Sequence, residues 1–138
     1  SIRGGSLTRA WRRGWRIDGG SFVKEPIFTH TELSDLIDDV IARTPHAWRI
    51  HGTVGHMHAY VSSVLDFTKD EVWWFYRRGL PSRSVWVTHR GQTHYFLYNQ
   101  RTGEISMRKE NRQGCEQGSF GPDEEPHDIQ EKLAVYFY

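Results

Sequence analysis

The sequence predicts an α+β fold in which one or two helices pack on a small antiparallel sheet of the meander type. The first observation is a capping box at Thr29 followed by apolar residues at helical spacing. The second is a later series of three alternating stretches joined by short turn-forming segments. Helices that precede a meander in this way are typical of a helix layer lying across one face of a twisted sheet.

The chain has 138 residues, which is enough for one hydrophobic core and too few for two. Residues 1–26 hold five glycines and no sustained hydrophobic period, so we expect an irregular basic arm there. Residues 27–138 form the predicted single α+β domain. Aromatic residues reach 14% of the chain, and a few large side chains can therefore build its core.

The first predicted helix begins after Thr29, which forms a capping box with Glu32. The apolar residues that share one face of this helix are Leu33, Leu36, Ile37, Val40 and Ile41. Pro45 predicts that the helix does not continue past Thr44.

The next segments predict two strands and a second helix. Residues 47–51 alternate as a strand does, and residues 58–65 contain enough Tyr and Val for another strand. Gly52 and Gly55 lie between them and indicate turns. Residues 68–76 repeat the capping-box pattern ahead of apolar side chains, so a short helix is expected there.

The meander is predicted over the three strands Ser84–Thr88, Thr93–Tyr98 and Glu104–Arg108. The Gly-rich, Pro-rich and acidic stretch Gly114–Pro126 predicts a loop, and Lys132–Tyr138 predicts a final strand.

The middle strand of the meander has two different faces, because side chains alternate along a strand. His94, Phe96 and Tyr98 share one face. Tyr95 and Leu97 share the other. We expect one face to meet the core and the other to be open.

The net charge of +1 conceals four blocks of alternating sign. Residues 1–20 carry five bases against one acid (+4), and residues 21–76 carry four against eight (−4). Residues 77–112 carry eight bases against two acids (+6), and residues 113–138 carry one against six (−5). Dense Lys and Arg can bind phosphate groups, which makes RNA an alternative partner of the basic segments. Solvated faces and a flexible basic arm explain the same blocks.

Several classes of protein are not indicated. No window approaches the ~20 apolar residues of a membrane span, and the N-terminal residues lack a signal-peptide pattern, so we expect a soluble, cytoplasmic protein. The single cysteine, Cys115, cannot form an internal disulfide or a Cys-x-x-Cys zinc site. No cofactor is predicted, because no Gly-rich phosphate loop, nucleophile elbow or zinc-protease motif is present.

Histidine is abundant, with eight residues in the chain. Five of them lie near Gly-containing turns, namely His51, His56, His58, His89 and His94. Neutral imidazole has a pKa of about 6.5 and can take or give a proton near neutral pH. Two of these side chains flanking a phosphodiester would make a metal-independent ribonuclease. Its phosphate would be held by Arg78, Arg83 or Arg90. Ordinary surface or hydrogen-bonded histidines are the competing explanation.

A metal site is a weaker alternative. His56 and His58 would face the same side of a strand, and His51 would have to supply a third ligand. A pair of histidines alone is not specific, and we predict no metal site.

Nine residues between Leu80 and Met107 carry a family resemblance, namely Leu80, Pro81, Trp86, Gly91, Gln92, Tyr95, Phe96, Asn99 and Thr102. Together they resemble a WW domain, a three-stranded meander that binds proline-rich peptides. The resemblance implies that Tyr95 and Leu97 line the binding groove while Phe96 packs behind it.

A second resemblance uses other residues. His58-Ala59-Tyr60-Val61 is similar to the histidine box of NlpC-type peptidases, LRAT-type acyltransferases and the viral H-box/NC proteins of some picornaviruses. In those families a strand histidine activates a cysteine on a later helix, and Gly114-Cys115 stands where the viral group has Asn-Cys. The resemblance implies a cysteine enzyme, or its inactive descendant, with Cys115 as nucleophile and His58 as base.

The leading hypothesis is a non-enzymatic protein-interaction domain that presents an aromatic sheet face to an extended peptide or protein partner. Its candidate ligand-binding residues are Tyr95, Leu97, Trp86 and His94. The cysteine enzyme and the histidine ribonuclease are the alternatives. A protein partner is expected first, and RNA on the basic segments is the second expectation.

Overall fold

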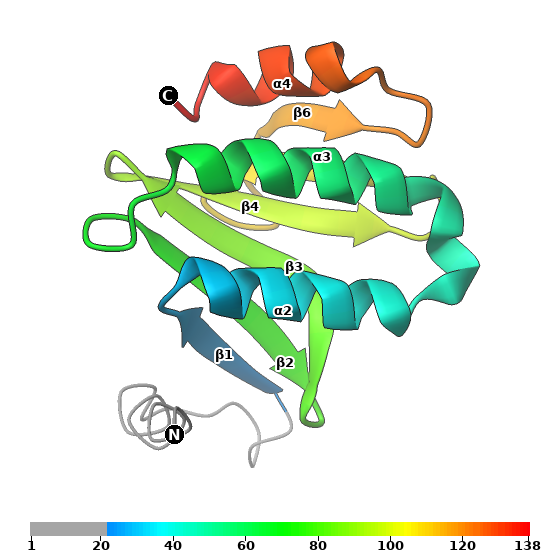
Figure 1. The fold of residues 1–138 in the computed structure, drawn as a ribbon, viewed down its shortest axis with the longest axis horizontal. Helices are drawn as coiled ribbons and strands as arrows, with labels where there is room; N and C mark the ends of the chain where they lie inside the picture. The colour runs from blue at the N-terminus through cyan, green and yellow to red at the C-terminus, as the bar shows by residue number, and fades with distance from the viewer. Residues whose placement is uncertain (1–21) are drawn as a thin grey trace.

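The computed structural model describes residues 22–138. Six antiparallel strands form one sheet, in which each strand pairs with the next along the chain. The strands are β1 (Phe22–Ile27), β2 (Glu71–Arg77), β3 (Leu80–His89), β4 (Gln92–Asn99), β5 (Glu104–Lys109) and β6 (Glu116–Phe120). Three α-helices, α2 (His30–Ala42), α3 (Trp48–Val64) and α4 (Pro126–Ala134), lie over one face (Figure 1). The predicted α+β class with a meander sheet is confirmed, with one helix more than expected.

The predicted capping box starts helix α2. The Thr29 hydroxyl oxygen accepts a hydrogen bond from the backbone N–H of Glu32 at 3.0 Å. The Glu32 carboxylate in turn accepts from the backbone N–H of Phe28 at 2.7 Å. These two bonds satisfy donors that a helix N-terminus leaves open, and they turn the chain directly from β1 into α2.

Strand β1 corrects the C-terminal boundary of the predicted basic arm. Residues 22–26 were assigned to this arm, but they pair with β2, and the side chains of Val23 and Ile27 are buried. Burial of these two residues fixes the strand at the edge of the sheet. The rest of the predicted arm lies outside the described residues.

Helix α3 replaces the two strands predicted at 47–51 and 58–65, so that prediction is wrong. The residues that α3 buries are Ile50, Thr53, Met57 and Val61. Their spacing of three and four follows the helical period. Gly52 and Gly55, which suggested turns, lie exposed on the outer side of the helix. Each costs about 1 kcal/mol of helix propensity, which the buried stripe offsets.

Strand β2 lies where a short helix was predicted from the Thr68 capping box, and this prediction is also wrong. Thr68 instead makes two hydrogen bonds to the Asp66 carboxylate in a turn. Along Glu71–Arg77 the residues Val72 and Trp74 alternate into the core. This period of two is that of a strand, and pairing with β1 on one side and β3 on the other stabilises it.

The C-terminal quarter also differs from the prediction. Strand β6 forms inside the expected loop Gly114–Pro126 and pairs with β5. Helix α4 begins at Pro126 and overlaps the strand predicted at Lys132–Tyr138. Proline suits the first turn of a helix, where its missing N–H is not needed. The residues that α4 buries are Ile129 and Leu133, one helical turn apart.

The predicted meander is confirmed as strands β3, β4 and β5, and its first hairpin depends on backbone conformation at the turn, where Arg90 and Gly91 have φ of +52° and +78°. The β2–β3 hairpin lies outside the predicted meander and has the same turn conformation, with φ of +53° at Arg78 and +79° at Gly79. Positive φ at both central residues defines the type I′ turn, whose twist matches that of the flanking strands. Glycine at the second position adopts this conformation without steric cost.

The chain after α4 folds back onto the sheet. Phe137 is fully buried, and its ring lies 5.7 Å from the ring of His89 and 5.0 Å from that of His94. The Tyr138 carbonyl accepts a hydrogen bond from Arg90 Nε at 2.8 Å, and His89 Nε2 lies 2.8 Å from the same oxygen. Within residues 22–138 no helix has both the length and the apolar character needed to cross a membrane.

Candidate functional site

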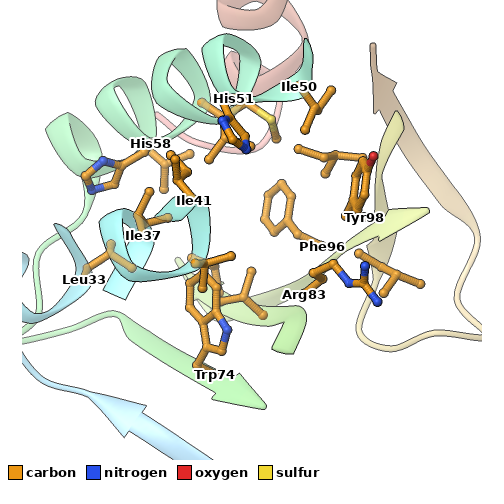
Figure 2. Close-up of a pocket in the computed structure, with 18 of the residues that line it drawn as sticks. Leu33, Ile37, Ile41, Ile50, His51, His58, Trp74, Arg83, Phe96 and Tyr98 are labelled. Atoms are coloured by element: carbon orange, nitrogen blue, oxygen red, sulfur yellow. The ribbon is translucent and has the colours of Figure 1, made fainter. Parts of the chain in front are cut away.

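An apolar cavity of about 150 Å³ lies between helices α2 and α3 and the sheet beneath them (Figure 2). Helix α2 contributes Leu33 and Ile37, and helix α3 contributes Ile50 and Val54. The floor is formed by residues of β2 to β5, namely Val72, Trp74, Val85, Val87, Phe96 and Ile105. Among the described residues, the lining contains no aspartate and no glutamate.

Hydrogen bonds made by lining residues hold the walls of the cavity in place. The indole Nε1 of Trp74 donates to the Ser82 carbonyl at 2.9 Å, which fixes the plane of the ring on the floor. Just after the C-terminal end of α2, the Thr44 hydroxyl donates to the Val40 carbonyl at 2.8 Å. His51 Nε2 donates to the Thr44 carbonyl at 2.9 Å and so ties the start of α3 to the end of α2.

Arg83 and Tyr98 form the polar rim on the strand side. Arg83 is exposed on β3, next to the Ser84–Leu97 pair that joins β3 to β4. Its guanidinium carbon lies 6.0 Å from the centre of the Tyr98 ring. Among the described residues Arg83 has no salt-bridge partner, and Figure 2 shows both side chains across the cavity from α3.

His58 lies at the edge of the cavity beside Ile37 of α2 (Figure 2). Its Nε2 is buried and has no hydrogen-bond partner within the described part of the chain. Burial lowers the pKa of His58 because it disfavours the charged ring, while the nearby Asp38 carboxylate opposes this effect. The ring is therefore a neutral, partly buried group at neutral pH.

The predicted pair His58 and Cys115 is not brought together. His58 faces α2 from the middle of α3. Cys115 is exposed in the connection between β5 and β6, where its carbonyl accepts from the backbone N–H of Lys109 at 3.0 Å. The two residues belong to different layers of the molecule, and the geometry does not support a base acting on this thiol.

The ribonuclease candidates are also separated. His56 is exposed on α3, and because α3 is a helix, His56 and His58 do not share a face as the metal hypothesis required. His89 and His94 both lie against the ring of Phe137, but both are buried. No three potential metal ligands gather anywhere in residues 22–138.

Of the predicted arginines, Arg90 is bonded to the Tyr138 carbonyl and Arg78 lies in the β2–β3 turn. Only Arg83 borders the cavity. Its position on the rim therefore differs from that of the other two.

The residues of the WW resemblance divide between the two faces as the alternation predicted. Phe96 packs into the core beneath the helices, whereas Trp86 and Tyr95 lie on the opposite side of the sheet. We call this side the helix-free face, because no helix of residues 22–138 covers it. Their rings are 5.0 Å apart, and Lys24 Nζ lies 4.3 Å from the centre of the Trp86 ring. The Tyr95 hydroxyl donates to Ser84 Oγ at 3.0 Å.

Two predicted ligand-binding residues have little free surface. Tyr95 is only 4% exposed, and His94 is 1% exposed on the helix-covered face. His94 Nδ1 is hydrogen-bonded to the Gln117 side chain at 2.7 Å. Trp86 and Leu97 are half-buried, and Leu97 also borders the cavity.

Acid should destabilise the fold through His94. Burial lowers the pKa of His94 below its unfolded value of about 6.5. As the pH falls from 7 to 5, the unfolded chain binds a proton that the folded ring resists, so the free energy of unfolding decreases. Urea unfolding at pH 7.5, 6.5 and 5.5 measures this, and His94→Gln should show a shallower decrease. Identical slopes for the variant and the wild type would contradict this role for His94.

The sequence named Arg83, His51 and His58 as candidates, but for other chemistry. It missed the cavity that they border, because α3 was predicted as strands. The spacing of Ile50, Val54, Met57 and Val61 was the signal that could have found it. No protein-family model and no curated protein matches this chain.

Proposed function

We propose that this protein binds a small apolar molecule in the cavity between α2, α3 and the sheet. The observation that carries the proposal is an apolar cavity with a few polar side chains confined to its rim. Ligand sites combine these two features, since the apolar walls provide affinity and the polar groups fix orientation.

The size of the cavity limits the ligand. An apolar cavity of about 150 Å³ accepts a molecule the size of benzene. The packing lost around an enclosed apolar cavity costs about 24 cal/mol per Å³, which gives at most about 3–4 kcal/mol for this partly open one. A ligand that fills it recovers part of this energy, so binding should stabilise the fold.

The helix-free face is the second candidate, with an extended peptide as its ligand. Trp86 is half-buried there, which favours this reading. The burial of Tyr95 beside Trp86 removes the central contact that a WW-like groove would use. The cavity is therefore the better supported site.

Toluene is a suitable probe of the cavity. At ten times its Kd a ligand stabilises the folded state by about 1.4 kcal/mol. For a domain of this size that raises Tm by about 4–6 °C. Val54→Phe, which places a ring inside the cavity from α3, should abolish the increase.

The matched control is Val135→Phe, because Val135 is exposed and lies outside the cavity. Its response to toluene should equal that of the wild type. An unchanged Tm in the wild type at saturating toluene would remove the proposed function. A proline-rich peptide that binds the wild type and Val54→Phe equally would favour the helix-free face instead.

A further inference from the structure

We propose that the ligand of this cavity carries a negative charge, and that Arg83 binds it at the rim. The expected class is a small aromatic or short aliphatic carboxylate, whose apolar body fills the cavity. This inference rests on the proposed function and adds the chemical class of the ligand.

The charge of the lining favours an anion. Among the residues of 22–138 that border the cavity, Arg83 is the only permanently charged side chain, and no acidic residue accompanies it. Asp39, a carboxylate near the end of α2, is already paired with Arg43 at 3.1 Å. A cationic ligand would therefore meet an uncompensated positive charge, whereas an anion would neutralise it.

The guanidinium of Arg83 has unused hydrogen-bonding capacity. It carries five N–H donors in a planar fork that matches the two oxygens of a carboxylate. Within residues 22–138 these donors make no hydrogen bond and no salt bridge, and the guanidinium carbon lies 6.0 Å from the centre of the Tyr98 ring. The N–H groups therefore have no partner in the described part of the chain and are available to a ligand.

His51 does not compete for this role. Its Nε2 is engaged with the Thr44 carbonyl at 2.9 Å, so this N–H is not open to a ligand. His58 is held neutral by burial. Arg83 is therefore the group that distinguishes an acid from its neutral analogue.

Three probes of nearly equal shape separate charge from size, namely phenylacetate, phenylacetamide and phenethylamine. Calorimetric titration of the wild-type protein at pH 7.5 should show phenylacetate binding about tenfold more tightly than the amide. The amine should bind more weakly than either. Equal affinities for the acid and the amide would overturn the inference.

Arg83→Gln removes the charge and keeps a polar side chain. It should lower phenylacetate affinity about tenfold and leave phenylacetamide unchanged. Arg83→Lys should give an intermediate value, because an ammonium is charged but lacks the planar fork. Arg112→Gln is the control, since Arg112 is exposed in the connection between β5 and β6.

The outcomes distinguish this inference from the proposed function. If toluene and phenylacetamide bind, but phenylacetate binds the wild type and Arg83→Gln with equal affinity, the cavity is a ligand site that does not select for charge. If neither toluene nor any of the three probes binds to the wild type, both proposals fail together. A loss of phenylacetate affinity in Arg112→Gln as large as in Arg83→Gln would also refute the role of Arg83.

Discussion

Replacing Phe137 with alanine is expected to lower the free energy of unfolding by about 3–5 kcal/mol. The Phe137 ring is fully buried and contacts the rings of His89, His94 and Phe96. Its loss removes apolar area and leaves a void that the surrounding rings can fill only in part. Urea unfolding monitored by tryptophan fluorescence measures the change.

Val135→Ala is the control for Phe137, because it lies two residues earlier and is 63% exposed. This variant should unfold within about 0.5 kcal/mol of the wild type. If Phe137→Ala were no more costly than Val135→Ala, the segment after α4 would not be part of the core.

Replacing Asp70 with alanine is the second large effect, also expected at about 3–5 kcal/mol. The Asp70 carboxylate accepts from His89 Nδ1 and from the backbone N–H of Asp66, both at 2.9 Å. Asp70 and His89 have side chains only 6% exposed. Without the carboxylate, a ring N–H and a backbone N–H stay buried without their acceptor.

The matched control uses an exposed ion pair. Asp123 Oδ2 lies 3.8 Å from Arg49 Nη2, and the Asp123 side chain is 90% exposed. Asp123→Ala should therefore lower the free energy of unfolding by less than about 1 kcal/mol. Asp70→Asn should fall between the two, because its amide oxygen can still accept a hydrogen bond. Equal unfolding energies for Asp70→Ala and Asp123→Ala would show that the buried pair contributes nothing.

The parts of the fold predicted correctly are those specified by neighbouring residues. Thr29 and Glu32 determine the start of α2 through bonds within one turn. Gly91 closes the β3–β4 hairpin because the turn needs positive φ at that position. Signals of this kind are complete within a few residues, so the sequence alone reveals them.

Elements determined by packing were predicted wrongly. Trp73 and Trp74 follow a capping-box pattern, yet strand pairing on both sides makes them alternate in β2. Gly52 and Gly55 suggested turns, yet the stripe that begins at Ile50 keeps α3 continuous. In each case tertiary contacts override a local preference.

The candidate site could not be predicted from short stretches of sequence, because tertiary packing forms it. Its walls come from α2, α3 and four strands, and the lining extends from Leu33 to Ile105. No short window holds enough of these residues to show that they enclose a cavity. Arg83 was recognised as a group able to bind an anion, but only the fold places it at the rim.

The most direct test of the cavity proposal is a methyl NMR titration of isoleucine-labelled protein with phenylacetate. Four isoleucines line the cavity, namely Ile37, Ile41, Ile50 and Ile105. Two buried isoleucines outside it, Ile27 and Ile129, serve as internal controls. We predict saturable shifts of the four cavity methyls, with the two controls unchanged. Saturable shifts elsewhere, with the four cavity methyls unmoved at millimolar phenylacetate, would contradict the account.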